Sequence, residues 1–268
     1  MRVALTRASP PMPTVSTTKP TTAPSTVAAP VTSTTARVRA VTRTTPVTRA
    51  PVRPRVTSPS VAVAAPAPLI DSIRELGSAE QVVTVTTSSW NASTATLQAF
   101  EKDGGAWRPV VGPTPAFVGV HGFAPPADKR EGDGRTPAGI YAFESMFGTD
   151  TDPGVHFSYR VAGPPDVWVD DPGSALYNTW QQDPAAGRWT SAEQLDQPAP
   201  YAHAAVIGWN TARVPGRGSA IFFHVSLGHG TAGCVAVNDA VLVQVLRWLD
   251  PARQPVIAMG PDAYVRHL

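Results

Sequence analysis

A histidine and the chain's single cysteine lie close together in the sequence, where they could act as a base and a nucleophile. His224 follows the apolar run 220–223, and Cys234 comes ten residues later, after a loop that contains Gly228 and Gly230. A cysteine attacks as its thiolate, and a neighbouring imidazole can take the thiol proton. The spacing therefore predicts a thiolate–imidazole pair in which His224 lowers the pKa of the Cys234 thiol.

Neighbouring residues could assist this pair or replace part of it. The N–H groups near Gly233 and Cys234 could stabilise the oxyanion of a tetrahedral intermediate. His229 is an alternative base, but it lies between glycines, whereas a strand would hold His224 rigidly. The two histidines and the cysteine could also bind a metal, although the set lacks a carboxylate and a second cysteine. A last alternative is that Cys234 is a small buried hydrophobic residue.

The first 68 residues differ in composition from the rest of the chain. Residues 1–68 contain 15 Thr, 12 Pro and nine Lys or Arg, and no Asp, Glu or aromatic residue. Such a segment cannot bury enough apolar surface to offset the entropy of ordering, so the sequence predicts a disordered Thr/Pro-rich tether. The tether would be an inert linker, or a stalk whose positive charge contacts an anionic wall or membrane surface. Residues 69–268 would form the folded domain.

Charge and cysteine content exclude several classes of protein. Residues 69–268 contain 13 basic and 20 acidic side chains without a basic stripe, which argues against nucleic-acid binding. A single cysteine excludes an internal disulfide and a multi-cysteine zinc site. No apolar run reaches the ~18 residues of a membrane-spanning helix, and the N-terminal residues lack the apolar stretch of a signal peptide.

Several short strands are predicted in the folded domain. The β-branched run 82–87 predicts a strand, and residues 96–107 predict a hairpin that turns at an Asp-Gly-Gly sequence. Residues 204–209 and 219–225 are continuously apolar, which is typical of central strands covered on both faces. The number of short strands favours a mainly β fold, a sandwich or barrel.

Two helices are predicted beside these strands. Residues 69–80 show a short apolar face, and residues 238–249 show the strongest helical pattern in the chain. Asn238 is a good N-cap for this second helix. The domain should therefore carry one well-packed C-terminal helix.

Three motifs follow one another in the chain: residues 134–139 (Gly-Arg-Thr-Pro-Ala-Gly), the Tyr-Asn pair at 177–178 with residues 201–210, and His224 followed by Thr-Ala-Gly-Cys at 231–234. In this order they resemble the L,D-transpeptidase catalytic domain, or YkuD-like, family. The family signature is a histidine at a strand end, then a loop and Ser/Thr-x-Gly-Cys, as in His224 and the Thr-Ala-Gly-Cys phrase that ends at Cys234. Residues 134–139 resemble the family's Gly-x-Thr-Pro-x-Gly segment. The Tyr-Asn pair at 177–178 and residues 201–210 fit one bacterial branch.

The resemblance covers about residues 115–260 and implies a β-sandwich-like fold with a cysteine acyl-enzyme mechanism. Cys234 would attack the L-to-D peptide bond of a peptidoglycan tetrapeptide stem and release D-alanine. An amine of a neighbouring stem would then take the acyl group, which forms a crosslink. His224 would be the general base, oriented through its other nitrogen by a backbone carbonyl, and Gly233 would supply an oxyanion N–H. Substrate contacts would come from Thr231, Tyr177, Asn178 and His229.

The implied protein is a secreted enzyme that uses no metal or cofactor. It would act as a monomer without a stable protein partner, outside the cytoplasm in the cell wall or a periplasm-like space. One alternative is a weak or inactive wall-binding domain of the same fold, because Ala232 and Ala236 stand where many members have a histidine and an arginine or asparagine. A sortase-like cysteine transpeptidase is the other, but sortases place their histidine several tens of residues before the cysteine.

Overall fold

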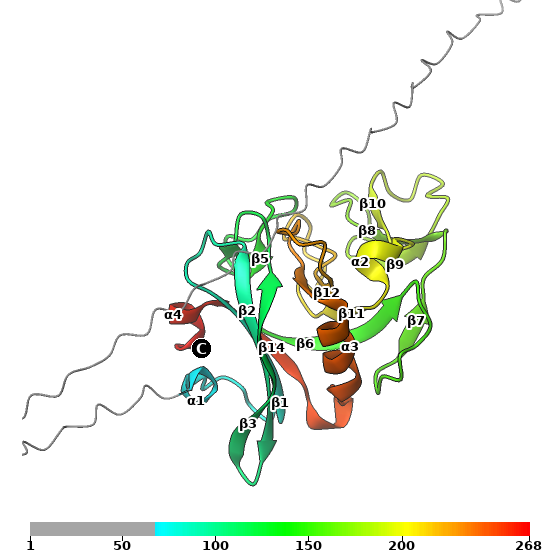
Figure 1. Cartoon of the computed structure of the whole chain (residues 1–268). Coiled ribbons are helices and arrows are strands. Elements are labelled where there is room, and N and C mark those ends of the chain that lie inside the picture. Colours follow the sequence, from blue (N-terminus) through cyan, green and yellow to red (C-terminus); the bar gives the residue numbers. More distant parts are fainter. Residues whose placement is uncertain (1–67) are drawn as a thin grey trace, which may run out of the picture. The chain divides into compact units, whose positions relative to one another are not determined.

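Short strands separated by turns make up most of the domain in the computed structural model, which describes residues 68–268 (Figure 1). The strands are β1 (Gln81–Thr87), β2 (Thr94–Asp103), β3 (Ala106–Phe117), β4 (Phe123–Ala124), β5 (Thr136–Pro137), β6 (Gly139–Gly148), β7 (Tyr159–Val161), β8 (Asp166–Val169), β9 (Thr179–Gln182), β10 (Ala192–Gln194), β11 (Ala204–Ile207), β12 (Phe222–Val225), β13 (Val235–Val237) and β14 (Val256–Pro261). The helices are α1 (Leu69–Ser72), α2 (Pro198–Tyr201), α3 (Asp239–Trp248) and α4 (Asp262–Val265), with a 3-10 turn at Pro251–Arg253.

Nine of these strands form one large sheet. Their order is β11-β12-β13-β3-β2-β1-β14-β6-β7, and a further pairing between β11 and β6 closes the order on itself. β1, the predicted β-branched strand, lies inside the sheet, antiparallel to β2 and parallel to β14. The prediction of a mainly β fold is therefore confirmed.

The predicted hairpin is formed by β2 and β3. Gly104 and Gly105 join the two strands with φ angles of +57° and +87°. A two-residue turn of this kind needs positive φ at both central positions, which glycine adopts without strain. The Asp-Gly-Gly sequence thus gave the position of the turn correctly.

The helix predicted for residues 69–80 is wrong beyond its first turn. After α1, Ile73 is extended, with φ −77° and ψ 117°. The Arg74 N–H donates to the carbonyl of the C-terminal residue, Leu268, at 2.5 Å, which replaces a bond inside a longer helix. The apolar side chains expected on the helix face are buried all the same: Ile70, Ile73 and Leu76.

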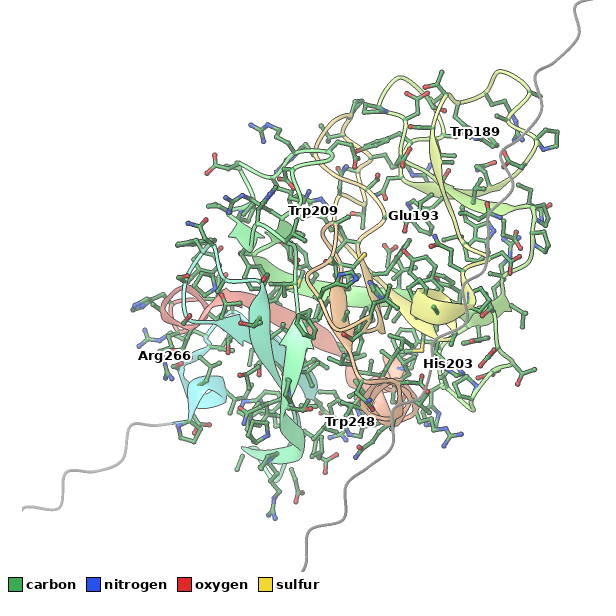
Figure 2. The ribbon with its side chains drawn as sticks, turned by 45° about the horizontal axis from the view of Figure 1, so that its top comes forward. Trp189, Glu193, His203, Trp209, Trp248 and Arg266 are labelled. Carbon is green, nitrogen blue, oxygen red and sulfur yellow. The ribbon has the colours of Figure 1, made fainter. Side chains whose placement is uncertain are left out.

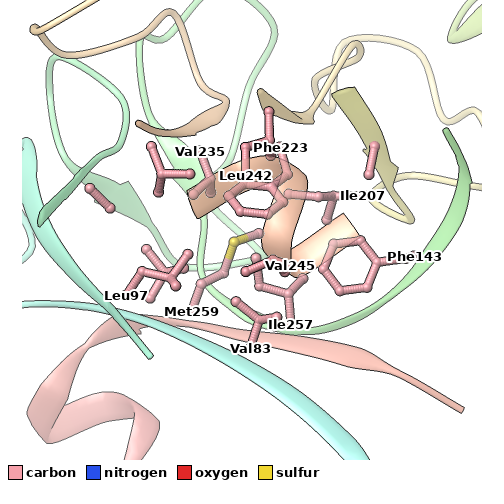
Figure 3. Packing of buried hydrophobic residues seen from close by; sticks show 14 of the residues in the cluster. Val83, Leu97, Phe143, Ile207, Phe223, Val235, Leu242, Val245, Ile257 and Met259 are labelled. Carbon is pink, nitrogen blue, oxygen red and sulfur yellow. The ribbon is translucent and has the colours of Figure 1, made fainter. Parts of the chain in front are cut away.

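The predicted C-terminal helix is α3, and it packs into the main core of the domain (Figure 3). The Asn238 side chain caps it by accepting a hydrogen bond from the Ala240 N–H at 3.1 Å. Leu242, Val245 and Leu246 are fully buried. They meet side chains from the surrounding strands: Phe143, Ile207, Phe223, Val235 and Ile257. This packing gives β12 and β13 a rigid support.

The two predicted central strands are β11 and β12, and nearly all their residues are buried. β12 begins later than predicted because residues 219–221 leave the strand conformation. Ala220 has a φ of +52°, a left-handed conformation that residues other than glycine adopt rarely. The chain therefore bends just before the strand that carries His224.

A smaller layer, which the sequence did not predict as strands, covers one face of β12. It consists of the three-stranded sheet β10-β8-β9 and the short helix α2. Trp168 and Tyr201 from this layer contact the Phe222 ring edge-on, with centroids 5.2 and 5.7 Å away. Cys234 belongs to the same buried cluster. The cysteine and histidine thus lie between the large sheet and the small layer.

The tether predicted for residues 1–68 lies outside the described residues except for its last residue, Pro68. Within residues 68–268 no helix combines the length and the apolar character needed to span a membrane.

Candidate active site

His224 lies in the middle of three paired strands, with β12 between β11 and β13. Its side chain is 7% exposed. Its Nδ1 lies 2.8 Å from the Val225 carbonyl oxygen, and the Tyr201 ring packs edge-on against it at 5.4 Å between centroids. A carbonyl oxygen can only accept, so Nδ1 carries the proton and Nε2 has the free lone pair. The backbone carbonyl expected to orient the ring is that of Val225, and it leaves Nε2 able to accept a proton.

Burial keeps the His224 ring neutral. Desolvation lowers the pKa of His224 to about 4, against a smaller rise caused by its bond to the Val225 carbonyl. A neutral imidazole can accept a proton, whereas an imidazolium cannot. The ring is thus ready to act as a base over the whole neutral range.

The Cys234 thiol is buried in the turn that precedes β13. Its Sγ donates to the Ala220 carbonyl oxygen at 3.2 Å and accepts from the Phe222 N–H at 3.3 Å. Desolvation, and then the charge of Glu193, raises the pKa of the thiol, while the Phe222 N–H and Lys129 lower it by less. The expectation that the pair lowers the thiol pKa is wrong for the resting protein, because burial outweighs every stabilising partner. The pair rests as neutral thiol and neutral imidazole.

Thr231 holds the turn that delivers the cysteine. Its hydroxyl donates to the Cys234 carbonyl oxygen at 2.7 Å and accepts from the Gly233 N–H at 3.1 Å. Its backbone pairs with the segment around Gly119, accepting from the Val120 N–H at 2.8 Å. The Gly233 N–H, predicted as an oxyanion donor, is thus occupied inside the turn.

The Gly-x-Thr-Pro-x-Gly segment reaches the same turn through Thr136. This buried hydroxyl donates to the Cys234 carbonyl oxygen at 3.2 Å and accepts from the Gly119 N–H at 2.9 Å. A Cβ at Gly119 would lie 2.4 Å from the Gly134 carbonyl oxygen, so the two loops are in tight contact. The sequence pointed to the segment, and the structure shows that Thr136 links it to the cysteine.

Tyr177 and Asn178 support the site from behind. Tyr177 is buried, and its hydroxyl donates to Glu131 and accepts from the Gly218 N–H at 3.1 Å. The Asn178 Oδ1 accepts from the Ala220 N–H at 3.2 Å and from Trp168 Nε1 at 2.8 Å. These bonds fix the backbone at 218–220, including the carbonyl that holds the thiol.

A cavity of about 460 Å³ opens over the cysteine and the histidine. Of the residues predicted for the site, it is lined by Cys234, His224, Gly233, Thr231 and His229. Tyr177 and Asn178 are not among its lining residues. Five of the seven predicted site residues thus line one cavity, and the other two do not line it.

The cavity also has charged walls that sequence reasoning missed. The charged residues are Lys129, Glu131, Asp170 and Glu193, and Tyr201 lies beside them. The Lys129 ammonium is buried and bound to the Asp133 carboxylate at 2.8 Å, whereas the Tyr201 hydroxyl donates to the Glu193 carboxylate. Desolvation raises the pKa of Glu193 to about 7. No sequence motif marks Glu193, because only the packing of the small layer brings it to the cavity.

The sequence also allows a metal site made of His224, His229 and Cys234. Across residues 68–268, no group of three His, Cys, Asp or Glu side chains is placed to hold a metal ion. His229 is exposed and its Nδ1 lies 2.9 Å from the Gly230 carbonyl oxygen.

The fold and the cavity define a class of protein: a mainly β domain with a buried cysteine and a buried histidine in one cavity. Residues 88–257 match the YkuD family, the L,D-transpeptidase catalytic domain, and the chain belongs to this family. Comparison with curated proteins gives no match.

One solved structure is similar, that of the helical cell shape determining protein Pgp2 from Campylobacter jejuni. The two share 14% sequence identity over 75% of this chain and 59% of that chain, with a TM-score of 0.35. This chain thus spans less than two thirds of the length of Pgp2.

Proposed function

We propose that this domain is a cysteine-dependent L,D-transpeptidase that acts on peptidoglycan tetrapeptide stems, releases D-alanine and forms crosslinks. The observation that carries the proposal is that Cys234 and His224 line one cavity in a member of the L,D-transpeptidase family. The substrate lies outside the cytoplasm, so the domain would work in the cell wall or a periplasm-like space. It would act as a monomer and without a cofactor.

Cys234 is the nucleophile and His224 the base in this proposal. Because both groups rest neutral, the thiol proton moves to His224 Nε2 as the sulfur attacks the carbonyl, rather than beforehand. The C–N bond of the stem then breaks, and the imidazolium returns the proton to the leaving amine of D-alanine. An acyl group remains on the sulfur as a thioester.

The oxyanion of this step needs N–H donors close to the sulfur. The Cys234 N–H forms no hydrogen bond within the described part of the chain and is the first candidate. The Gly233 N–H can contribute only if it leaves the Thr231 hydroxyl. Thr231 and His229 line the cavity and are proposed substrate contacts, whereas Tyr177 and Asn178 would act through the 218–220 backbone.

A carbapenem tests the acyl-enzyme directly, because a β-lactam carbonyl is an acylating group that a cysteine nucleophile can open. We expect mass spectrometry of the full chain to show a single drug adduct. The adduct should be absent in Cys234→Ala, with thermal melting used to show that this variant is folded. The His224→Gln variant should form the adduct about 100-fold more slowly, since a general base contributes at least this much.

A folded wild-type protein that forms no adduct with the drug, and none with a tetrapeptide thioester, would refute the nucleophile assignment. In that case a domain that still binds stem peptides without turnover would be the inactive wall-binding protein considered from the sequence.

A further inference from the structure

Glu193 is a carboxylate in the cavity that the acylation steps above do not use. Glu193, labelled in Figure 2, lies on β10 opposite Trp168 of β8. Its side chain lines the same cavity as Cys234 and His224. The Tyr201 hydroxyl donates to it, and the same Tyr201 ring packs against the His224 ring. Glu193 is therefore held beside the reacting groups by a residue that also touches the base.

The surroundings of Glu193 are negative on balance. Glu131 and Asp170 line the same cavity, and the Asp170 Oδ1 atom is buried without a hydrogen-bond partner within residues 68–268. Among the described residues that line the cavity, Lys129 is the cation, and its ammonium donates to the Asp133 carboxylate and to the Arg130 carbonyl oxygen. A positively charged group would thus meet carboxylates in this cavity.

Glu193 can also exchange a proton near neutral pH. Desolvation raises its pKa to about 7, the Tyr201 hydroxyl opposes this rise, and the charges of Asp170 and Glu131 add to it. Cys234 and Lys129 are the other titratable groups that share this wall, besides the histidines 224 and 229. A base with a pKa near the working pH is the most effective one.

In the second half of the reaction, the transfer of the acyl group to an amine, one proton has no acceptor among the groups described so far. A primary amine acceptor with a pKa of about 10 arrives as an ammonium ion, whose nitrogen has no lone pair. One proton must leave before the nitrogen can form its bond to the acyl carbon. As the C–S bond breaks, a second proton passes from the nitrogen through His224 to the cysteine sulfur. A water acceptor needs only this second transfer.

We propose that Glu193 is the base that takes the first proton from an ammonium acceptor and, with Glu131 and Asp170, selects acceptors of this charge. The inference rests on the proposed acyl-enzyme at Cys234. In the balanced step, the ammonium and the Glu193 carboxylate become an amine and a carboxylic acid. The amine then attacks the thioester, the thiol is regenerated, and the acid releases its proton to water when the product leaves.

The test is how the acyl-enzyme divides between two amines and water. The full chain is given a soluble tetrapeptide donor with Nα-acetyl-lysine amide, an ammonium ion at pH 7, or with hydroxylamine, which is uncharged there. We expect Glu193→Gln to lower transfer to the lysine acceptor about 100-fold relative to hydrolysis, the lower end of what a general base contributes. Transfer to hydroxylamine should stay within about threefold of wild type, and acylation by a carbapenem should not slow, because burial and, after it, the Glu193 charge raise the pKa of the Cys234 thiol.

Two further variants separate a base from a structural residue. Glu144→Gln removes an exposed carboxylate that lines a different cavity, and it should leave the division unchanged. Tyr201→Phe removes the hydroxyl that stabilises the charged Glu193 carboxylate, so the pKa of Glu193 should rise further. Transfer to the lysine acceptor should then begin at a higher pH than in wild type.

The possible results test the role of Glu193 separately from the acyl-enzyme. Equal losses with both amines in Glu193→Gln, or no loss with either, overturn the role of Glu193 while the acyl-enzyme stands. A wild-type acyl-enzyme that only water can resolve also overturns it. If wild type forms no acyl-enzyme at all, the proposed function fails, and this inference fails with it.

Discussion

Two groups in the cavity should make opposite contributions to the pH dependence of stability. The pKa of His224 is lowered from 6.5 to about 4 in the folded protein. Its contribution to the free energy of unfolding is therefore fully present above pH 6.5 and is lost as pH falls toward 4. At about 1.4 kcal/mol per pKa unit, the loss is about 3 kcal/mol.

Glu193 behaves in the reverse sense. Its pKa is raised from 4.5 to about 7, so the folded state holds its proton more tightly than the unfolded state does. Its contribution is fully present below pH 4.5 and is lost as pH rises toward 7, again by about 3 kcal/mol. Between pH 4.5 and 6.5 the two contributions nearly cancel in wild type.

In Glu193→Gln the contribution of His224 to the pH dependence of the free energy of unfolding should no longer be cancelled. We expect the free energy of unfolding of this variant to fall by about 1.4 kcal/mol for each pH unit between 6.5 and 4.5, relative to wild type. Urea unfolding of the full chain at several pH values in this window measures the slope. The variant His224→Asn should show the opposite slope, and Glu144→Gln should follow wild type.

The difference between variants in the slope of unfolding free energy against pH does not depend on the other acidic residues. Asp166 and Asp171 have lowered pKa values, so they take up protons mainly below this window, and they do so in every variant. A Glu193→Gln protein with the same slope as wild type would refute the reasoning, because Glu193 would then be ionised in the folded protein throughout the window.

Two predictions concern the supports of the site. Leu246→Ala, a fully buried position in α3, should lower the free energy of unfolding by about 2–5 kcal/mol in urea titration, and a loss below 1 kcal/mol would mean that the α3 core is loosely packed. Thr136→Val leaves the Gly119 N–H without its partner and should cost about 1–3 kcal/mol. The same variant should slow carbapenem acylation of Cys234, and an unchanged acylation rate would show that Thr136 supports the fold but not the turn.

Much of the fold could be predicted because its signals are local. The β-branched run of β1, the glycines of the β2–β3 turn and the Asn238 cap each act on their own segment of chain. The helix predicted at residues 69–80 was wrong because its second half is decided by a distant partner. The Arg74 N–H bonds the far end of the chain, which no pattern within the segment could reveal.

Part of the candidate site could also be predicted from the sequence. Cys234 and His224 are ten residues apart in one motif, so their spacing was enough to predict that they lie in the same site. The pKa of the thiol could not be predicted, because it depends on how fully the small layer covers the sulfur. Glu193 was missed for the same reason, since only the folding of β10 and α2 against β12 carries it to the cavity.

The hydrogen bond from the Cys234 thiol to the Ala220 carbonyl has a consequence for how the thiol withstands oxidation. Small oxidants and alkylating agents react with the thiolate, and a buried thiol that is held protonated offers them very little of it. In the proposed function, a substrate that fits the cavity would displace that bond while His224 takes the thiol proton. The one thiol of the chain is thus kept unreactive toward such agents, and we expect it to react when a molecule fits the cavity.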